Sequence, residues 1–115
     1  MSKLIYKILP ATEWQAALAA TKFAGSAIDI ADGYIHLSTA EQVRETADKW
    51  FAGQEGLLLA TFDPADFQQT LKWETSRDGA LFPHIYGSMS VGLVKSLVAL
   101  KADANGAFVF PDDIP

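Results

Sequence analysis

The chain has 115 residues, half of them apolar and 11% aromatic, which is enough for one domain with a buried core and excludes a disordered chain. Lys and Arg number 9 against 14 Asp and Glu, so the formal charge is −5, and we expect no general binding to DNA or RNA. The absence of cysteine excludes a disulfide, a thiolate nucleophile and a cysteine-based zinc site.

The N-terminal residues lead directly into a predicted strand, with no signal-peptide pattern. No apolar run reaches the ~18–20 residues needed to span a bilayer, so we expect one cytoplasmic domain over residues 1–115 and no membrane partner. Residues 3–9 alternate in polarity, with Lys7 opposite the apolar face, as in a strand. Thr12 then predicts the start of a short alanine-rich helix that buries Trp14.

A turn at Asp32-Gly33 precedes a predicted strand over residues 34–38. Tyr34, His36 and Ser38 share one face of this strand, because side chains alternate. A helix is predicted to start at Ser38 or Thr39, since each is followed three residues later by Glu or Gln, the capping-box spacing. Its predicted buried stripe comprises Val43, Ala47, Trp50 and Phe51.

The second half of the chain predicts mostly strands. The apolar run at 57–62 is typical of a strand covered on both faces. Asn105-Gly106 predicts the turn of a final hairpin, followed by a short acidic tail at 111–115 without an apolar pattern. Predicted strands cover residues 57–62, 70–75, 81–87, 95–101 and 107–110. This order indicates an α+β fold, with two helices packed against a mixed or antiparallel sheet.

Chemically versatile side chains recur on three of these strands. If the strands adjoin, imidazole, carboxylate, phenol and hydroxyl groups form one polar, aromatic-walled surface, able to bond ribose hydroxyls or move protons near neutral pH. The predicted helix start at Thr39 would add a site for a phosphate or carboxylate. The candidate residues are His36, Ser38, Thr39, Glu74, Arg77, His84 and Tyr86.

Each candidate also has a purely structural interpretation. An isolated histidine can be a half-buried residue bonded to backbone, Ser38 and Thr39 can simply cap a helix, and Glu74 can form a surface ion pair. The three tryptophans, Trp14, Trp50 and Trp73, are interpreted as core residues.

Three segments together resemble a bacterial family known as domain of unknown function 952. They are the run Asp-Gly-Tyr-Ile-His-Leu-Ser-Thr at 32–39, Leu-Lys-Trp-Glu at 71–74 and Phe-Pro-His-Ile-Tyr-Gly at 82–87. The similarity covers nearly the whole chain, including the opening Ile-Tyr-Lys-Ile at 5–8 and Glu13-Trp14.

The resemblance implies a fold like that of the ADP-ribosyltransferases, a small split β structure with helices against it that holds NAD in its cleft. On this basis His36 would contact ribose, and Tyr86 or His84 would flank the nicotinamide. The chain lacks the Ser-Thr-Ser triplet and late Glu-x-Glu of such transferases, and Glu74 is the candidate acid.

Three hypotheses follow. The first is a pocket for NAD or ADP-ribose, bound by His36, Ser38, Thr39, Arg77 and Tyr86, in which His36, Glu74, His84 and Tyr86 catalyse ADP-ribosyl transfer or N-glycosidic cleavage. The second is a non-catalytic module that uses the same pocket for a small anionic metabolite. The third is a metal-assisted hydrolase with His36, His84 and Glu74 as ligands; the first two need no metal. The sequence does not determine the oligomeric state.

Overall fold

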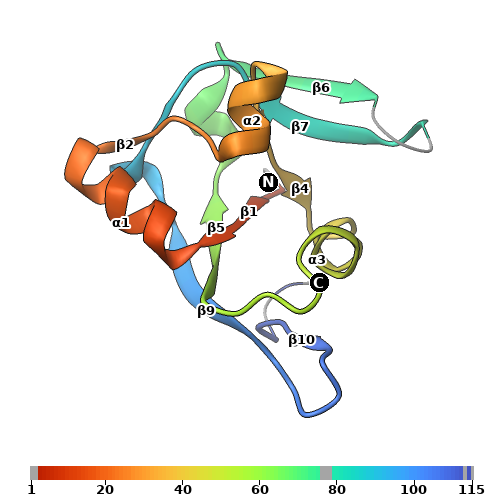
Figure 1. The fold of residues 1–115 in the computed structure, drawn as a ribbon. Coiled ribbons are helices and arrows are strands. Elements are labelled where there is room, and N and C mark those ends of the chain that lie inside the picture. The colour runs from red at the N-terminus through yellow and green to blue at the C-terminus, as the bar shows by residue number, and fades with distance from the viewer. Residues whose placement is uncertain (1–2, 76–78, 113, 115) are drawn as a thin grey trace.

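Antiparallel pairing organises the part of the chain that the computed structural model describes, residues 3–75, 79–112 and 114. The central strands β1 (Ile5–Pro10) and β5 (Leu57–Phe62) pair along their full lengths. They are the middle of a five-stranded sheet in the order β10 (Phe108–Val109), β9 (Ser96–Ala102), β5, β1, β4 (Ser38–Thr39). In Figure 1, β9 and β10 lie on one side of this pair and β4 on the other.

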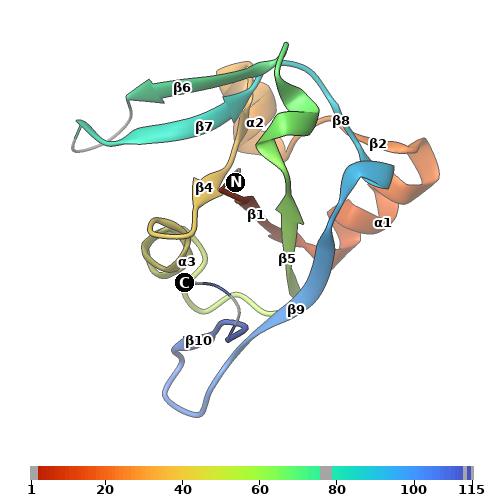
Figure 2. The same ribbon diagram turned by 180° about the vertical axis from the view of Figure 1, so that it is seen from behind.

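A second sheet carries the candidate site. Its order is β3 (Ile35–His36), β7 (Leu81–Ile85), β6 (Leu71–Thr75), and it lies at the top of both ribbon views (Figures 1 and 2). The chain passes from β3 into β4 at Leu37, whose N–H donates to the Pro83 carbonyl at 3.0 Å. A two-stranded ladder of β2 (Lys22–Phe23) and β8 (Met89–Ser90) completes the strand pairs of the described residues.

In the part of the chain that the structure describes, three α-helices connect these strands: α1 (Ala11–Ala20), α2 (Ala27–Asp32) and α3 (Val43–Trp50). Short 3₁₀ turns occupy Pro64–Phe67 and Val91–Leu93. A reciprocal capping box between Ser26 and Asp29 starts α2, and Gly33 ends it in the left-handed conformation, with a φ of 89°. Every helix in the described residues is too short or too polar to cross a bilayer. The fold is therefore α+β, as predicted, with antiparallel sheets.

β1 separates two apolar cores, because its side chains alternate between them. Ile5 and Leu9 join a cluster with α1 and the three-stranded sheet, whereas Tyr6 and Ile8 join one that contains α3 and β9 residues. The run in β5 likewise feeds both clusters, which confirms the prediction that this strand is covered on both faces.

Several local predictions are wrong. Ser38 and Thr39 lie in a strand and α3 begins only at Val43, while the predicted strand over residues 34–38 is interrupted at Leu37. The helix α2 was not predicted, so the described residues contain one more α-helix than the two expected.

The expected core also differs at three side chains. Trp50 and Trp73 are about half exposed, at 52% and 45%, because the helix and sheet faces that carry them extend beyond the two cores. In the acidic tail, Ile114 is buried in the second cluster, and its carbonyl accepts a hydrogen bond from Arg44 at 3.2 Å.

We predict that Leu59→Ala lowers the free energy of unfolding by about 2–5 kcal/mol, because Leu59 is 1% exposed and its loss leaves a cavity in the second core. Leu97→Ala, on the neighbouring strand at 38% exposure, should cost less than half as much. Urea unfolding of both variants measures the difference; equal losses would contradict the assignment of the core.

Candidate functional site

The three-stranded sheet brings the predicted histidines together. His36 on β3 lies directly opposite His84 on β7, and Lys72 on β6 lies opposite His84 on the other side. Directly paired residues share a face of a sheet, and so do residues two positions along a strand. Tyr34, Glu74 and Tyr86 therefore join the histidines on one face. We call Tyr34, His36, Glu74, His84 and Tyr86 the histidine–tyrosine cluster.

Tyr34 is the centre of the ring contacts in this cluster. Its ring stacks on that of His84, with centroids 4.3 Å apart and planes 25° apart. It also lies 4.8 Å from the His36 ring and 5.2 Å from the Tyr86 ring, both tilted. The two imidazoles are 5.4 Å apart in an edge arrangement. Four aromatic rings thus pack as one group within offset-stacking and edge-contact distances.

The Glu74 carboxylate joins His84 to Tyr86. Its Oε1 accepts hydrogen bonds from His84 Nδ1 and from the Tyr86 hydroxyl, both at 2.8 Å, and its Oε2 lies 3.0 Å from the same hydroxyl. The bond from His84, followed by that from Tyr86, lowers the pKa of Glu74, and the bond to Glu74 raises the pKa of Tyr86. Glu74 is therefore an ionised carboxylate at neutral pH, and Tyr86 a neutral phenol.

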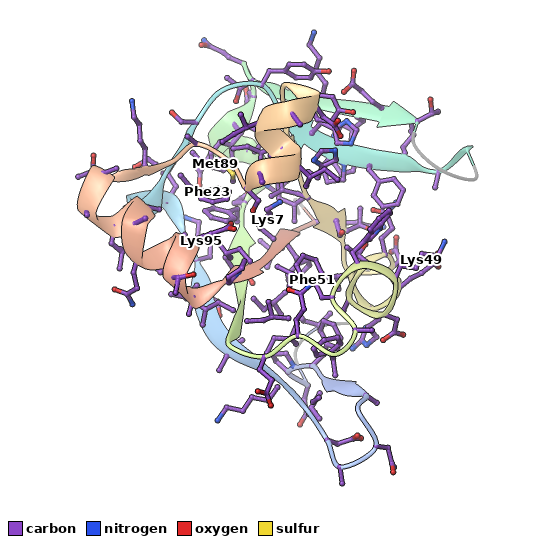
Figure 3. The ribbon with its side chains drawn as sticks, in the orientation of Figure 1. Lys7, Phe23, Lys49, Phe51, Met89 and Lys95 are labelled. Atoms are coloured by element: carbon purple, nitrogen blue, oxygen red, sulfur yellow. The ribbon has the colours of Figure 1, made fainter. Side chains whose placement is uncertain are left out.

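Asp29 lies beneath the cluster and is almost completely buried, at 1% exposure. One carboxylate oxygen accepts from His36 Nδ1 at 2.6 Å and from the His36 backbone N–H at 3.1 Å. The other lies 2.9 Å from Lys7 Nζ and accepts from the Ser26 N–H at 2.9 Å. Figure 3 shows Lys7 in the interior of the molecule, on β1 and close to α2. One carboxylate therefore ties α2 to β1 and β3.

These contacts set the ionisation of the buried pair. Burial by itself would raise the pKa of Asp29, but the hydrogen bond from His36 and the charge and hydrogen bond of Lys7 lower it to about 2. Burial lowers the pKa of Lys7, against the opposing effect of Asp29.

The low pKa of Asp29 makes the stability depend on pH. Because the folded value lies below the ordinary value of 3.8, ionised Asp29 stabilises the fold at pH above 3.8 by about 2 kcal/mol. That contribution decreases as the pH falls from 3.8 and is lost below about 2.

His36 has carboxylates at both ring nitrogens. Nδ1 meets Asp29, and Nε2 lies 3.0 Å from Asp32, which is four residues earlier and partly exposed. The His36 side chain is 31% exposed, so a ligand can reach its outer edge, whereas His84 is only 3% exposed and lies beneath Tyr34.

The predicted binding residues Ser38 and Thr39 lie elsewhere. Ser38 is buried, and its hydroxyl is 2.9 Å from that of Thr46 on α3. Gln42 accepts from the Thr39 N–H at 3.1 Å, while the buried Thr39 hydroxyl has no hydrogen-bond partner among the described residues. Arg77 lies outside the described residues.

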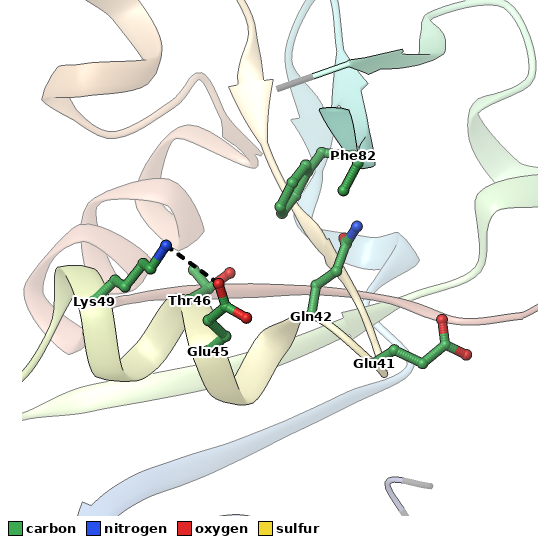
Figure 4. A pocket seen from close by; sticks show the side chains of 7 residues that line it. Glu41, Gln42, Glu45, Thr46, Lys49 and Phe82 are labelled. Carbon is green, nitrogen blue, oxygen red and sulfur yellow. Dashed lines mark ion pairs between the residues drawn. The ribbon is translucent and has the colours of Figure 1, made fainter. Parts of the chain in front are cut away.

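A hollow of about 160 Å³ lies near Ser38 and Thr39, between α3 and the start of β7 (Figure 4). The Phe82 ring projects into it opposite Thr46 and Gln42, and Glu45 pairs with Lys49 at 3.2 Å along one wall. The histidine–tyrosine cluster is not part of its lining, so the cluster and this hollow are separate features.

The cluster is poorly arranged for a metal ion. Both nitrogens of His36 and Nδ1 of His84 already face carboxylates. Residues 3–75, 79–112 and 114 contain no group of three His, Asp or Glu placed to hold a metal.

Sequence reasoning did not propose Lys7, Asp29, Asp32 or Tyr34 as site residues. Two local signals were available: Ser26 and Asp29 have capping-box spacing, and Asp32 precedes His36 by four residues. The strand alternation correctly predicted that Tyr34 shares a face with His36. Its ring contact with His84, however, depends on the pairing of β3 with β7.

The chain belongs to the family described as protein of unknown function (DUF952), whose model matches residues 8–97. It is 50% identical to Protein CC0527 from Caulobacter crescentus, whose X-ray crystal structure gives a TM-score of 0.88 over 92% of this chain and 93% of that one. The solution NMR structure of CC0527 matches at 51% identity with a TM-score of 0.81, covering 90% and 89% of the two chains. No curated protein matches the chain.

We predict that Asp29→Asn destabilises the protein by about 3–5 kcal/mol, because it leaves Lys7 buried without a compensating charge. Asp32→Asn is the matched control on the same helix, and it should cost less than about 1 kcal/mol because Asp32 is partly exposed. Chemical denaturation at neutral pH measures both. Comparable losses in the two variants would show that Asp29 does not organise this region.

Proposed function

We propose that the histidine–tyrosine cluster binds a ligand of the NAD or ADP-ribose type, as in the ADP-ribosyltransferase-like fold that the sequence resembles. The supporting observation is the assembly of two tyrosines, a carboxylate and an imidazole on one accessible sheet face. The ligand must lie on the outside of this face, since the rings beneath it are closely packed. A cytoplasmic location, where such nucleotides occur, belongs to the same proposal.

Each exposed group matches one part of such a ligand. Tyr86 and Tyr34 offer ring surface for a planar base, because aromatic rings stack in offset geometry. The carboxylate of Asp32, which lies 3.0 Å from His36 Nε2, can accept hydrogen bonds from ribose hydroxyls. His84 is too deeply buried to bond a phosphate, and its contribution is to position Glu74.

Charge limits where a diphosphate can lie. Asp32 and Glu74 repel phosphate, whereas Lys72 lies 4.9 Å from the centre of the Tyr86 ring and supplies a positive charge at the outer strand. We therefore orient the ligand with its base over the tyrosines and its phosphates toward Lys72.

If the site is catalytic, the reaction it suits is N-glycosidic cleavage of NAD. Water would bond to the anomeric carbon as the carbon–nitrogen bond breaks, and the bonding electron pair would leave with nicotinamide. The proton from water would pass to solvent. The ionised Glu74 and Asp32 carboxylates would stabilise the positive charge that develops on the ribose.

The bonds of Glu74 favour a second candidate, a binding module without turnover. Both oxygens of this carboxylate already accept from Tyr86, and one also accepts from His84. A carboxylate whose two oxygens already accept hydrogen bonds from neighbouring side chains is better placed to orient those side chains than to act on a substrate. No contact in the described residues favours the metal-assisted hydrolase.

Titration calorimetry and thermal shift with NAD and ADP-ribose test the proposal. We predict saturable binding and a higher melting temperature, because a ligand that binds only the native state stabilises it. Tyr86→Ala should weaken binding by about tenfold or more through loss of stacking. Trp73 is an exposed aromatic residue on the opposite face of β6, so Trp73→Ala should leave the ligand affinity unchanged.

No binding at millimolar ligand would refute the nucleotide site. If binding occurs, release of free nicotinamide from NAD separates the two candidates: release identifies the glycosidase, and binding without release identifies the module.

A further inference from the structure

The outer strand of the three-stranded sheet has an open edge. β6 pairs with β7 on one side, and no other described strand lies on its second side. In both ribbon views β6 lies along the upper rim of the molecule, above β7 (Figures 1 and 2). Such an edge presents backbone groups that can pair with another chain.

The hydrogen-bond pattern identifies which backbone groups face that edge. The Tyr86 N–H donates to the Thr70 carbonyl at 2.9 Å, so the backbone of Thr70 points toward β7. Bonding alternates along an antiparallel pair, and the N–H and C=O groups of Leu71, Trp73 and Thr75 therefore point away from β7. Pro83, which lacks an N–H, lies opposite Trp73, where no bond to β6 is required.

The side chains of this strand are self-complementary. If a second copy pairs antiparallel with Trp73 opposite its own equivalent, Lys72 lies opposite Glu74 of the partner subunit, and Glu74 lies opposite Lys72 of the partner subunit. Opposite charges at directly paired positions stabilise strand pairing. The adjacent two-fold registers would place either the two lysines or the two glutamates opposite each other, which disfavours them.

The face of the three-stranded sheet opposite Lys72 and Glu74 carries exposed apolar side chains. Trp73 is 45% exposed and Leu81 is 53% exposed, and the register makes them diagonal neighbours. In the two-fold arrangement the two Trp73 rings would come together and lose contact with water. Exposed apolar groups on an unpaired edge strand are otherwise unfavourable in a monomer.

We infer that β6 pairs with β6 of a second copy of this chain, forming a two-fold symmetric dimer with a continuous six-stranded sheet. The Leu71, Trp73 and Thr75 positions supply the backbone bonds, the Trp73 pair supplies the apolar contact, and the Lys72–Glu74 pairs fix the register. One short strand buries little surface, so the association is weak and concentration-dependent. The inference does not depend on the proposed ligand, although it brings Lys72 of the partner subunit to the rim of the histidine–tyrosine cluster.

Sedimentation velocity of the full chain, from low micromolar to near-millimolar concentration and without ligand, tests the dimer. The wild type should shift reversibly from monomer to dimer. Trp73→Lys places like charges at the two-fold axis and should weaken association by at least about tenfold. Val109→Lys, at a 58% exposed position on β10, is the control and should associate as the wild type does.

Charge exchange tests the register. K72E and E74K should each associate more weakly than the wild type, and an equimolar mixture should form a heterodimer, because every facing pair then has opposite charges. A wild type that stays monomeric at the highest concentration overturns the inference, as does a folded Trp73→Lys variant that dimerises like the wild type. If the wild type dimerises but an equimolar mixture of folded K72E and E74K does not form a heterodimer, the proposed register is wrong.

Discussion

The Asp29 carboxylate is the contact on which the candidate site depends. It receives hydrogen bonds from a buried lysine, a histidine and two backbone N–H groups that come from β1, β3 and the start of α2. Only Asp29 is buried among the α2 residues, and Ile28 and Ile30 are more than half exposed. The helix is therefore attached to the sheets mainly by the polar contacts of Asp29.

The close approach at this point also explains a glycine. Gly25 has a φ of 119°, and a Cβ atom placed there would lie 2.8 Å from Cβ of Asp29. A side chain would thus be strained by its backbone conformation and would collide with Asp29. The segment before α2 is consequently built to bring Asp29 against β1 and β3, where it orients His36.

The parts of the fold with a clear hydrophobic period could be predicted from the sequence. Residues 57–62 and 3–9 form strands much as expected, and the Asn105-Gly106 turn joins β9 and β10. The six-residue α2 was missed because a helix this short, with exposed isoleucines, has no apolar stripe. At Ser38 the capping pattern was misleading, since its hydroxyl bonds Thr46 across the packed interior instead of a helix N-terminus.

The candidate site could likewise be predicted only in part from the sequence. The alternation at residues 34–36, 72–74 and 84–86 predicted which side chains share a face, but the direct pairing of His36 with His84 is a contact across 48 residues that no local pattern specifies. The roles of Lys7 and Asp29 were hidden for a related reason. Each looks like an ordinary solvent-facing charge, and only tertiary packing shows that both are buried as a pair.

The most direct test of the role of Asp29 is an NMR titration of its side-chain carboxyl carbon, with Asp32 observed in the same spectra as an internal reference. We expect the Asp29 carboxyl to stay ionised well below its ordinary pKa of 3.8 and to titrate at about 2, or only when the protein unfolds in acid. An Asp29 carboxyl that takes up its proton near 3.8 in the folded protein would contradict the claim that this carboxylate holds Lys7 and His36 in place.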